Sequence, residues 1–261
     1  MDYALITLTS LFVSGLTLFS GFGLGTLLTP AFALFFPIPT AIAATAVVHL
    51  SNNLFKLALV GKQADWRVVA RFSLPAALAA LVGASVLVGF AELPALMSYE
   101  LSGRTVEITP VKLVIGSLIV VFASLELSSG LDGLSIPSKY LPLGGLLSGF
   151  FGGLSGNQGA FRSAFLIKAG LAKEAFVATG VVSAVIVDSV RLSVYGLSYF
   201  ATSFRAVPEE IAGLVASATL AAFIGAFFGK RLLQKVTLRT VQIIVAACMI
   251  GVGGGLASGL I

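Results

Sequence analysis

Long runs of hydrophobic residues alternate with short polar segments along this chain. Six of these runs approach or exceed the roughly 20 residues that a membrane-crossing helix needs. They cover residues 40–60, 68–90, 111–127, 174–199, 206–228 and 238–261. Polar connectors lie at residues 91–110, 128–139, 201–208 and 229–239. The pattern predicts an all-α integral membrane protein that crosses the bilayer several times.

Two further hydrophobic regions contain interruptions. Residues 3–36 are interrupted by a glycine-rich stretch at 20–26 and then by Pro30, and residues 140–167 by another glycine-rich stretch at 152–159. Glycine clusters with polar neighbours are unfavourable inside a helix. Each region is therefore predicted to form two helical pieces joined by a break.

The two halves of the chain resemble each other. Residues 43–46 read Ala-Ala-Thr-Ala and residues 177–180 read Val-Ala-Thr-Gly, and the same offset places Gly25 on Gly159. With one inserted residue, Asn53, Lys56 and Gly61 fall on Asp188, Arg191 and Gly196. We interpret residues 1–127 and 128–261 as two repeats within one membrane domain, each a broken region followed by three spans. The alternative is a chance likeness between helices rich in glycine and alanine.

Loop charges suggest how the repeats are oriented. Basic residues flank the turn near residue 62 and recur at 229–239, whereas residues 91–110 carry Glu92, Glu100 and Glu107 against Arg104. Basic connectors favour the cytoplasmic side. If each broken region enters the membrane and returns, the basic connectors share that side, the N-terminus lies outside and the repeats are inverted, a plan common in transporters. The alternative is eight continuous spans with one violation of the charge rule.

Composition supports the membrane class and excludes others. Hydrophobic residues make up 57% of the chain, charged residues only 10%, and mean hydropathy is +1.05. So few charges cannot form a water-facing surface, since soluble domains carry about 25%. The net charge of +5 fits basic loops and not a nucleic-acid surface. The single cysteine, Cys248, excludes an intrachain disulfide and a multi-cysteine metal cluster.

The helix breaks are the strongest candidates for a binding site. Irregular backbone at membrane depth persists only where protein or a watery cavity satisfies it. The helix that restarts after a break aims N–H groups with partial positive charge into the membrane, which suits an anion. The predicted anion-binding residues at the two breaks are Gly23, Gly25, Thr26, Asn157, Gln158 and Gly159. The alternative is that the glycines only permit close helix packing.

Two arginines could add positive charge to this site. Arg162 follows the second break by three residues, and its planar guanidinium fits an oxyanion. Arg191 lies near the centre of a span, three residues after Asp188, so the two can pair on one helix face. We interpret both arginines as substrate ligands. The alternatives are an Arg162 that reaches the cytoplasmic edge and a purely structural Asp188–Arg191 pair.

Other polar residues inside the spans suggest proton coupling. Burial disfavours the charged form of a carboxylate, so Asp188 could take up a proton. His49, the only histidine, lies mid-span and titrates near neutral pH. A hydrogen-bonded structural histidine is the alternative. Asn52 and Asn53 follow in the same span, and because adjacent residues cannot share a helix face, at least one, assigned as Asn52, is expected to face the pathway.

Motifs of other function classes are missing from the sequence. It contains no HExxH, Gly-x-Ser-x-Gly or nucleotide-binding GxxxxGK[ST] segment. We therefore expect no enzyme and no cofactor. The expected partners are a small anionic substrate and the lipid bilayer, not nucleic acid, and a homodimer is left open. An anion channel, a carrier for another anion and a membrane enzyme or assembly factor are the alternative classes.

Several segments together resemble a known family. They are Gly21 through Gly25 with Pro30, residues 43–46, Gly61 with Asp65-Trp66, residues 75–83, and residues 149–159 followed by Ala178-Thr179. The chain resembles the sulfite exporter TauE/SafE family, also called the toluenesulfonate uptake permease family. The resemblance implies a secondary carrier, driven by an ion gradient, for sulfite, sulfonates or sulfoacetate in a bacterial or archaeal inner membrane. The second break, residues 155–159, is more polar than the family's usual glycine run, which leaves the exact substrate and its direction open.

Overall fold

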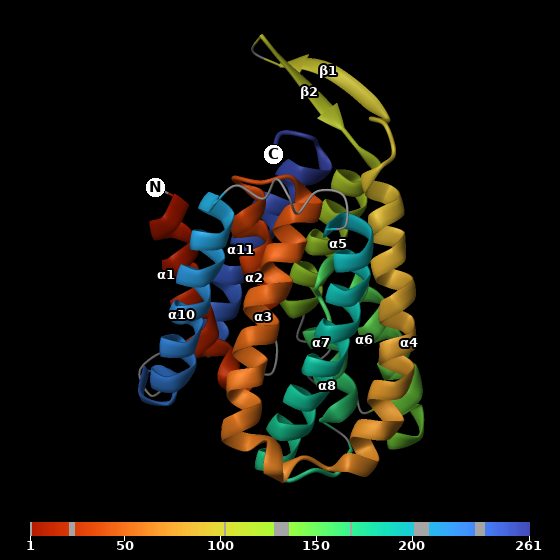
Figure 1. Ribbon diagram of the computed structural model, residues 1–261, viewed down its shortest axis with the longest axis vertical. Helices are drawn as coiled ribbons and strands as arrows, with labels where there is room; N and C mark the ends of the chain where they lie inside the picture. Colours follow the sequence, from red (N-terminus) through yellow and green to blue (C-terminus); the bar gives the residue numbers. More distant parts are fainter. Residues whose placement is uncertain are drawn as a thin grey trace.

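The computed structural model describes residues 2–20, 24–101, 103–127, 136–167, 169–200, 209–232 and 238–261. They form a helical bundle with one β-hairpin projecting from the end at which both termini lie (Figure 1). The helices are α1 (Asp2–Ser20), α2 (Leu24–Ala33), α3 (Ile38–Val60), α4 (Trp66–Ala91), α5 (Pro110–Leu127), α6 (Leu141–Ser155), α7 (Gly159–Leu166), α8 (Lys173–Tyr195), α10 (Glu209–Leu232) and α11 (Leu238–Ala257). Short helical turns are η1 (Gly61–Gln63), η2 (Ser138–Tyr140) and the π-helical η3 (Gly196–Phe200).

Within the described residues, four helices are long and apolar enough to cross a membrane. They are Ile38–Gln63, Trp66–Ala91, Lys173–Ser198 and Ile211–Phe228, and shorter apolar helices occupy Tyr3–Gly15, Pro110–Leu125 and Ala246–Ala257. The predicted all-α, multi-pass membrane class is confirmed. The predicted spans match these helices with end points that differ by a few residues, because the helices begin and end at local signals and not at the limits of the hydrophobic runs.

The predicted polar connector at residues 91–110 differs from expectation, because it contains a β-hairpin. Strands β1 (Met97–Leu101) and β2 (Arg104–Ile108) pair antiparallel, with Tyr99 opposite Val106. Alternating residues and β-branched side chains favour strands here. Gly103 supplies the turn with a φ of +76°, a conformation that favours glycine.

The turn between α3 and α4 is held by local hydrogen bonds. Asp65 caps α4, because its Oδ1 accepts hydrogen bonds from the backbone N–H groups of Arg67 (2.9 Å) and Val68 (3.0 Å). The backbone N–H of Asp65 donates to Thr179 Oγ1 of α8 at 3.0 Å. The α3–α4 turn therefore lies beside the start of α8, so α3 and α8 run antiparallel.

Small residues bring α6 directly against α4. A Cβ atom added at Gly145, Gly149 or Gly153 would collide with the backbone of α4, at the carbonyl oxygens of Phe72, Ala76 and Ala80 respectively. Glycine at every fourth position permits such close helix packing in membranes. Because higher-numbered residues of α6 meet higher-numbered residues of α4, the two helices run parallel.

A similar parallel contact joins α1 to α10. Ser10 and Ser14 of α1 donate hydrogen bonds to the backbone oxygens of Ala218 (2.6 Å) and Ala222 (2.7 Å) of α10. A Cβ at Gly225 would collide with the carbonyl oxygen of Leu11. The α5–α11 pair also packs closely, with Gly116 against Gly253 and Ala257.

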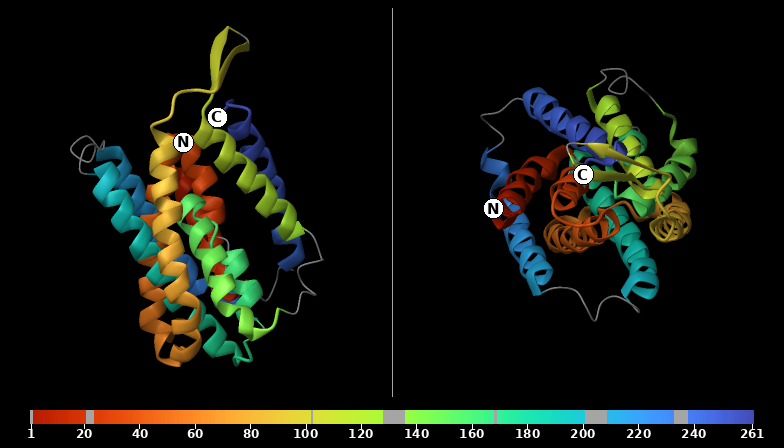
Figure 2. Two further views of the ribbon diagram at one scale, coloured as in Figure 1. Left: turned by 90° about the vertical axis from the view of Figure 1, so that its right-hand side faces the viewer. Right: turned by 90° about the horizontal axis from the view of Figure 1, so that it is seen from above.

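The two broken regions reverse direction inside the bundle. In the second, Gly144 near the start of α6 lies against Phe165 near the end of α7, and Ser148 Oγ donates to Gln158 O at 2.8 Å. This hairpin therefore enters and returns on the side of the α3–α4 turn. In the first, the chain starts at the opposite end and the α2–α3 connection returns there, and Figure 2 shows the bundle from two further directions. The inverted-repeat relationship itself stays a prediction.

Candidate functional site

The two helix breaks meet in the interior of the bundle. A Cβ atom added at Gly25, in the first turn of α2, would lie 3.1 Å from the carbonyl oxygen of Gly156 and 3.9 Å from Cδ2 of His49. Gly156 ends α6 with a φ of +82°, and a Cβ there would lie 3.0 Å from Nη1 of Arg191. The first break therefore contacts the second break and α3, and the second break contacts Arg191 of α8. Gly23 and the side chain of Thr26 lie outside the described residues.

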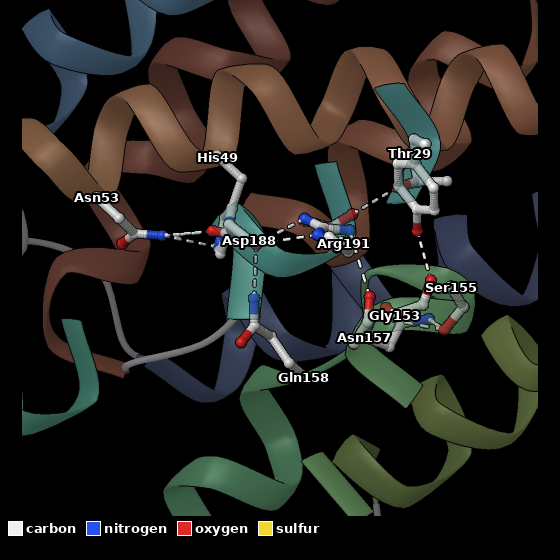
Figure 3. Close-up of polar contacts among 12 residues, drawn as sticks. Thr29, His49, Asn53, Gly153, Ser155, Asn157, Gln158, Asp188 and Arg191 are labelled. Carbon is white, nitrogen blue, oxygen red and sulfur yellow. Dashed lines mark hydrogen bonds and ion pairs between the residues drawn. The ribbon is translucent and has the colours of Figure 1, made fainter. Parts of the chain in front are cut away.

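The carboxylate of Asp188, on α8, is the centre of a buried polar cluster (Figure 3). Its Oδ2 lies 2.6 Å from Nδ1 of His49 and accepts a hydrogen bond from Asn53 Nδ2 at 3.3 Å. Its Oδ1 accepts from Gln158 Nε2 at 2.8 Å and from Arg191 Nε at 3.0 Å. One carboxylate thus joins α3, α8 and the second break.

Arg191 links this cluster to the end of α6. Its Nη2 lies 2.8 Å from Asp188 Oδ1, and both side chains are 0% exposed. Its Nη1 donates to the carbonyl oxygen of Gly152 at 3.4 Å, which also accepts the backbone N–H of Gly156 at the end of α6. The predicted Asp188–Arg191 pair is therefore present, and its arginine also contacts the break.

Arg162, on α7, belongs to the same network. Its Nη1 donates to Gln158 Oε1 at 3.2 Å, and the amide of Gln158 then donates to Asp188. Arg162 is 5% exposed. The alternative in which this arginine reaches the aqueous edge of the membrane is therefore wrong, because its guanidinium lies inside the protein.

Several buried polar atoms here have no hydrogen-bond partner. Both amide atoms of Asn52 and the Oδ1 of Asn157 are in this state, although Asn157 Nδ2 donates to Ser155 Oγ at 3.2 Å. Buried polar groups are almost always paired. These atoms are available to a ligand, and Asn157 lies directly before Gln158 and the start of α7 at Gly159.

Sequence reasoning missed two residues that support the site. Tyr195 of α8 donates its hydroxyl hydrogen bond to the carbonyl oxygen of Gly153, and Thr29 of α2 donates to Gly25 O at 2.9 Å. Each lies four residues from a predicted site residue, Tyr195 from Arg191 and Thr29 from Gly25. Residues at this spacing share a helix face, and that signal could have identified both.

The chemistry available here is anion binding and proton exchange. Within the part of the chain that the structure describes, no group of three His, Cys, Asp or Glu side chains is placed to hold a metal ion. The site instead combines guanidinium groups, amides, backbone at a helix break and a carboxylate–imidazole pair. Such groups bind an oxyanion and can exchange a proton.

Comparison with known proteins agrees with this chemistry. Searches of the curated proteins and of the solved structures found no match. A family model described as "Sulfite exporter TauE/SafE" matches residues 5–256, which is nearly the whole chain. This protein belongs to the sulfite exporter TauE/SafE family of membrane transporters.

Proposed function

We propose that this protein is a secondary transporter that moves a small sulfur-containing oxyanion, sulfite or an organosulfonate, across the cell membrane by alternating access. The observation that carries the proposal is an excess of buried positive charge beside two helix breaks. The family description supports the substrate class, because it names sulfite.

The buried charges of the described residues are mostly positive. Lys56, Arg162 and Arg191 are 6%, 5% and 0% exposed, and Asp188 is the carboxylate buried with them. Asp188 offsets the charge of Arg191 by direct contact. Buried positive charge is costly, so the net positive charge of these side chains favours the binding of an anion.

The second break supplies further donors for this anion. The first N–H groups of α7 have no partner within the helix and begin at Gly159, where no side chain blocks an approaching oxygen. Asn157 and Gln158 adjoin this turn, and Gly25 brings the first break against it. We assign the anion to this place, with Arg162 and Arg191 as its cationic ligands and Asn52 as a neutral one.

The packing of the helices supports two inverted repeats. In the predicted repeats, α1, α3, α4 and α5 are equivalent to α6, α8, α10 and α11. Replacing each helix by its equivalent changes the α4–α6 contact into the α1–α10 contact, and the α4–α8 contact into the α3–α10 contact. All four of these helix pairs pack together. The α3–α8 and α5–α11 contacts convert into themselves. When two inverted repeats pack in related ways, each repeat can adopt the conformation of the other, which opens the site to the opposite side of the membrane. This exchange is the basis of alternating access.

The contact between His49 and Asp188 supports proton coupling. A proton on Asp188 would neutralise the carboxylate that holds Arg191. Arg191 would then be released to bind the anion. Anion and proton would therefore bind together and move in the same direction, and loss of the proton would return Arg191 to Asp188.

The test is uptake by purified protein in liposomes. We expect saturable uptake of labelled sulfite or an alkanesulfonate. The uptake should be stimulated by a proton gradient and should show counterflow. Sulfate and chloride are added as test competitors. Arg162→Ala and Arg191→Ala should each reduce uptake by about tenfold or more, because hydrogen bonds to buried charges contribute ~1.5–3 kcal/mol.

Arg67, which is exposed at the start of α4, provides the matched control. Arg67→Ala should transport like the original protein. Unsaturable flux without counterflow would indicate a channel. If both buried-arginine variants transported normally, the assignment of the anion ligands would be wrong.

A further inference from the structure

Two hydrogen bonds join α4 to α8 at the end of the bundle that contains the α3–α4 turn. The backbone N–H of Asp65 donates to Thr179 Oγ1 at 3.0 Å, and Ser73 Oγ donates to Ser183 Oγ at 2.8 Å. The side chains of Ser73, Thr179 and Ser183 are all buried. These two hydrogen bonds therefore hold α4 against α8 and keep this end of the bundle closed.

Thr45 of α3 is equivalent to Thr179 of α8 in the predicted repeats. Each threonine lies about two turns into its helix, and each is 0% exposed. In the part of the chain that the structure describes, however, the hydroxyl of Thr45 has no hydrogen-bond partner. A helical threonine can donate to the carbonyl oxygen four residues earlier, as Thr29 does to Gly25. Thr45 makes neither this local bond nor the tertiary bond of Thr179, and such a buried unpaired hydroxyl is unusual.

The α3–α10 interface is the counterpart of the α4–α8 interface, and Thr45 lies level with the start of α10. Both α3 and α10 begin at the end of the bundle where the termini lie (Figure 1). The rings of Phe55 and Phe223 stack, which sets the register of the two helices. At α4–α8, the donor to Thr179 is the backbone N–H of the residue before α4 begins. The corresponding donors for Thr45 are the first N–H groups of α10, which have no partner within the helix.

We infer that Thr45 closes the other end of the bundle in the second conformation of the transport cycle, by accepting a backbone N–H from the first turn of α10. The inference rests on the proposed alternating access and deepens it. In the present conformation, Thr179 accepts the N–H of Asp65 and the α3–α4 end is closed. In the second conformation that bond is broken and the equivalent bond of Thr45 is made. Because one hydrogen bond replaces the other, the two conformations stay close in free energy and can exchange.

The two threonines should therefore act in opposite directions. Thr179→Val removes the acceptor of a hydrogen bond in the present conformation, so it favours the second one. Thr45→Val removes no bond from the present conformation and one bond from the second, so it favours the present one. Thr45 lies roughly 22 Å along the helix axis from Val60, the last residue of α3. An effect of Thr45 at the α3–α4 end thus requires a change of conformation and not a direct contact.

A buried cysteine between the two hydrogen bonds of α4 and α8 can report the opening of the α3–α4 end. Val69 is 4% exposed and lies one helical turn from both Asp65 and Ser73. Val69→Cys is introduced together with Cys248→Ser, because Cys248 is exposed. The rate at which a water-soluble maleimide labels this variant measures how often the α3–α4 end opens. Adding Thr179→Val should raise the rate by about two- to tenfold, and adding Thr45→Val should lower it by a similar factor, as expected for one hydrogen bond.

Thr219→Val is the matched control, because Thr219 of α10 donates to the carbonyl oxygen of Val215 in its own helix, at 2.7 Å. It should leave the labelling rate unchanged. A misfolded variant would be labelled faster, so slower labelling in Thr45→Val cannot arise from loss of structure. Unchanged or faster labelling in Thr45→Val would overturn the inference.

Transport in liposomes separates this inference from the proposed function. Opposite shifts of the labelling rate, in a protein that moves no anion, would support the exchange of hydrogen bonds and contradict the transport function. Saturable transport with counterflow by the original protein, together with labelling that Thr45→Val leaves unchanged, would overturn the exchange and leave the transport function in place.

Discussion

The α4–α6 and α3–α8 contacts are both buried, but they are built from different groups. At α4–α6, glycines bring two backbones together, and Gly145, Gly149 and Gly153 leave no room for a Cβ atom. At α3–α8, His49 meets Asp188 and charged side chains occupy the interface. The first contact is fixed by shape and the second by charge.

The comparison separates two roles of glycine in one segment. The stripe that contains Gly149 packs against α4, whereas Gly156, seven residues further along, has a left-handed conformation beside Arg191. Packing and site formation were competing interpretations of the glycine-rich sequence. In the structure, the glycines that pack against α4 and the glycine beside Arg191 are different residues. Three substitutions test the comparison, and two of them are at these glycines.

The largest effect is expected at Asp188. Asp188→Ala leaves Arg191 and the other buried cations without their carboxylate, so the unfolding free energy should fall by about 3–5 kcal/mol. Proteoliposome uptake should be lost, and thermal unfolding in detergent measures the stability. Asp65→Ala, which removes only the cap of α4, should cost about 1 kcal/mol. Equal losses for the two variants would contradict the central role of Asp188.

The second effect concerns helix packing alone. Gly149→Ala forces α4 and α6 apart, and overpacking of this kind costs about 1–3 kcal/mol. Thermal unfolding should show the loss, while the KM of the protein that remains folded should stay unchanged. Gly89→Ala in α4 is the control, because no atom lies within 4 Å of its added Cβ. Because alanine favours a helix more than glycine does, Gly89→Ala should not lower stability. A stability loss shared by both variants would show that the contact with α4 is not the cause.

The smallest effect on stability is expected at Gly156, but it should appear in transport. Gly156→Ala places a Cβ in a left-handed conformation, at a cost of about 1–2 kcal/mol, and against Nη1 of Arg191. The KM should therefore rise, in contrast to Gly149→Ala. A Gly156→Ala variant with normal KM and reduced stability would place Gly156 with the packing glycines.

Much of the fold could be predicted because each membrane helix is determined mainly by the residues of its own segment. Hydrophobic runs of sufficient length predicted α3, α4, α8 and α10, and residues 155–159 predicted the break before α7. The hairpin β1–β2 was missed because its two short strands lie in a connector whose charges dominated the interpretation. The spacing from Arg191 places Tyr195 on the same helix face, but it does not predict that the partner of its hydroxyl is the backbone carbonyl oxygen of Gly153.

The candidate site was only partly predictable. Helical spacing predicted that Asp188 could pair with Arg191, since the two lie on one helix. It could not predict that His49, 139 residues away, would contact the same carboxylate. Nor could it decide whether Arg162 lies at an aqueous edge or inside the protein.

The sequence by itself determined that this chain is a multi-pass helical membrane protein with interrupted segments, because hydrophobic length and clustered glycines act within a single helix. The tertiary structure decided which polar groups share one interior position and which remain without partners. Those outcomes depend on how antiparallel helices cross, and crossing is set by packing between residues far apart in the chain.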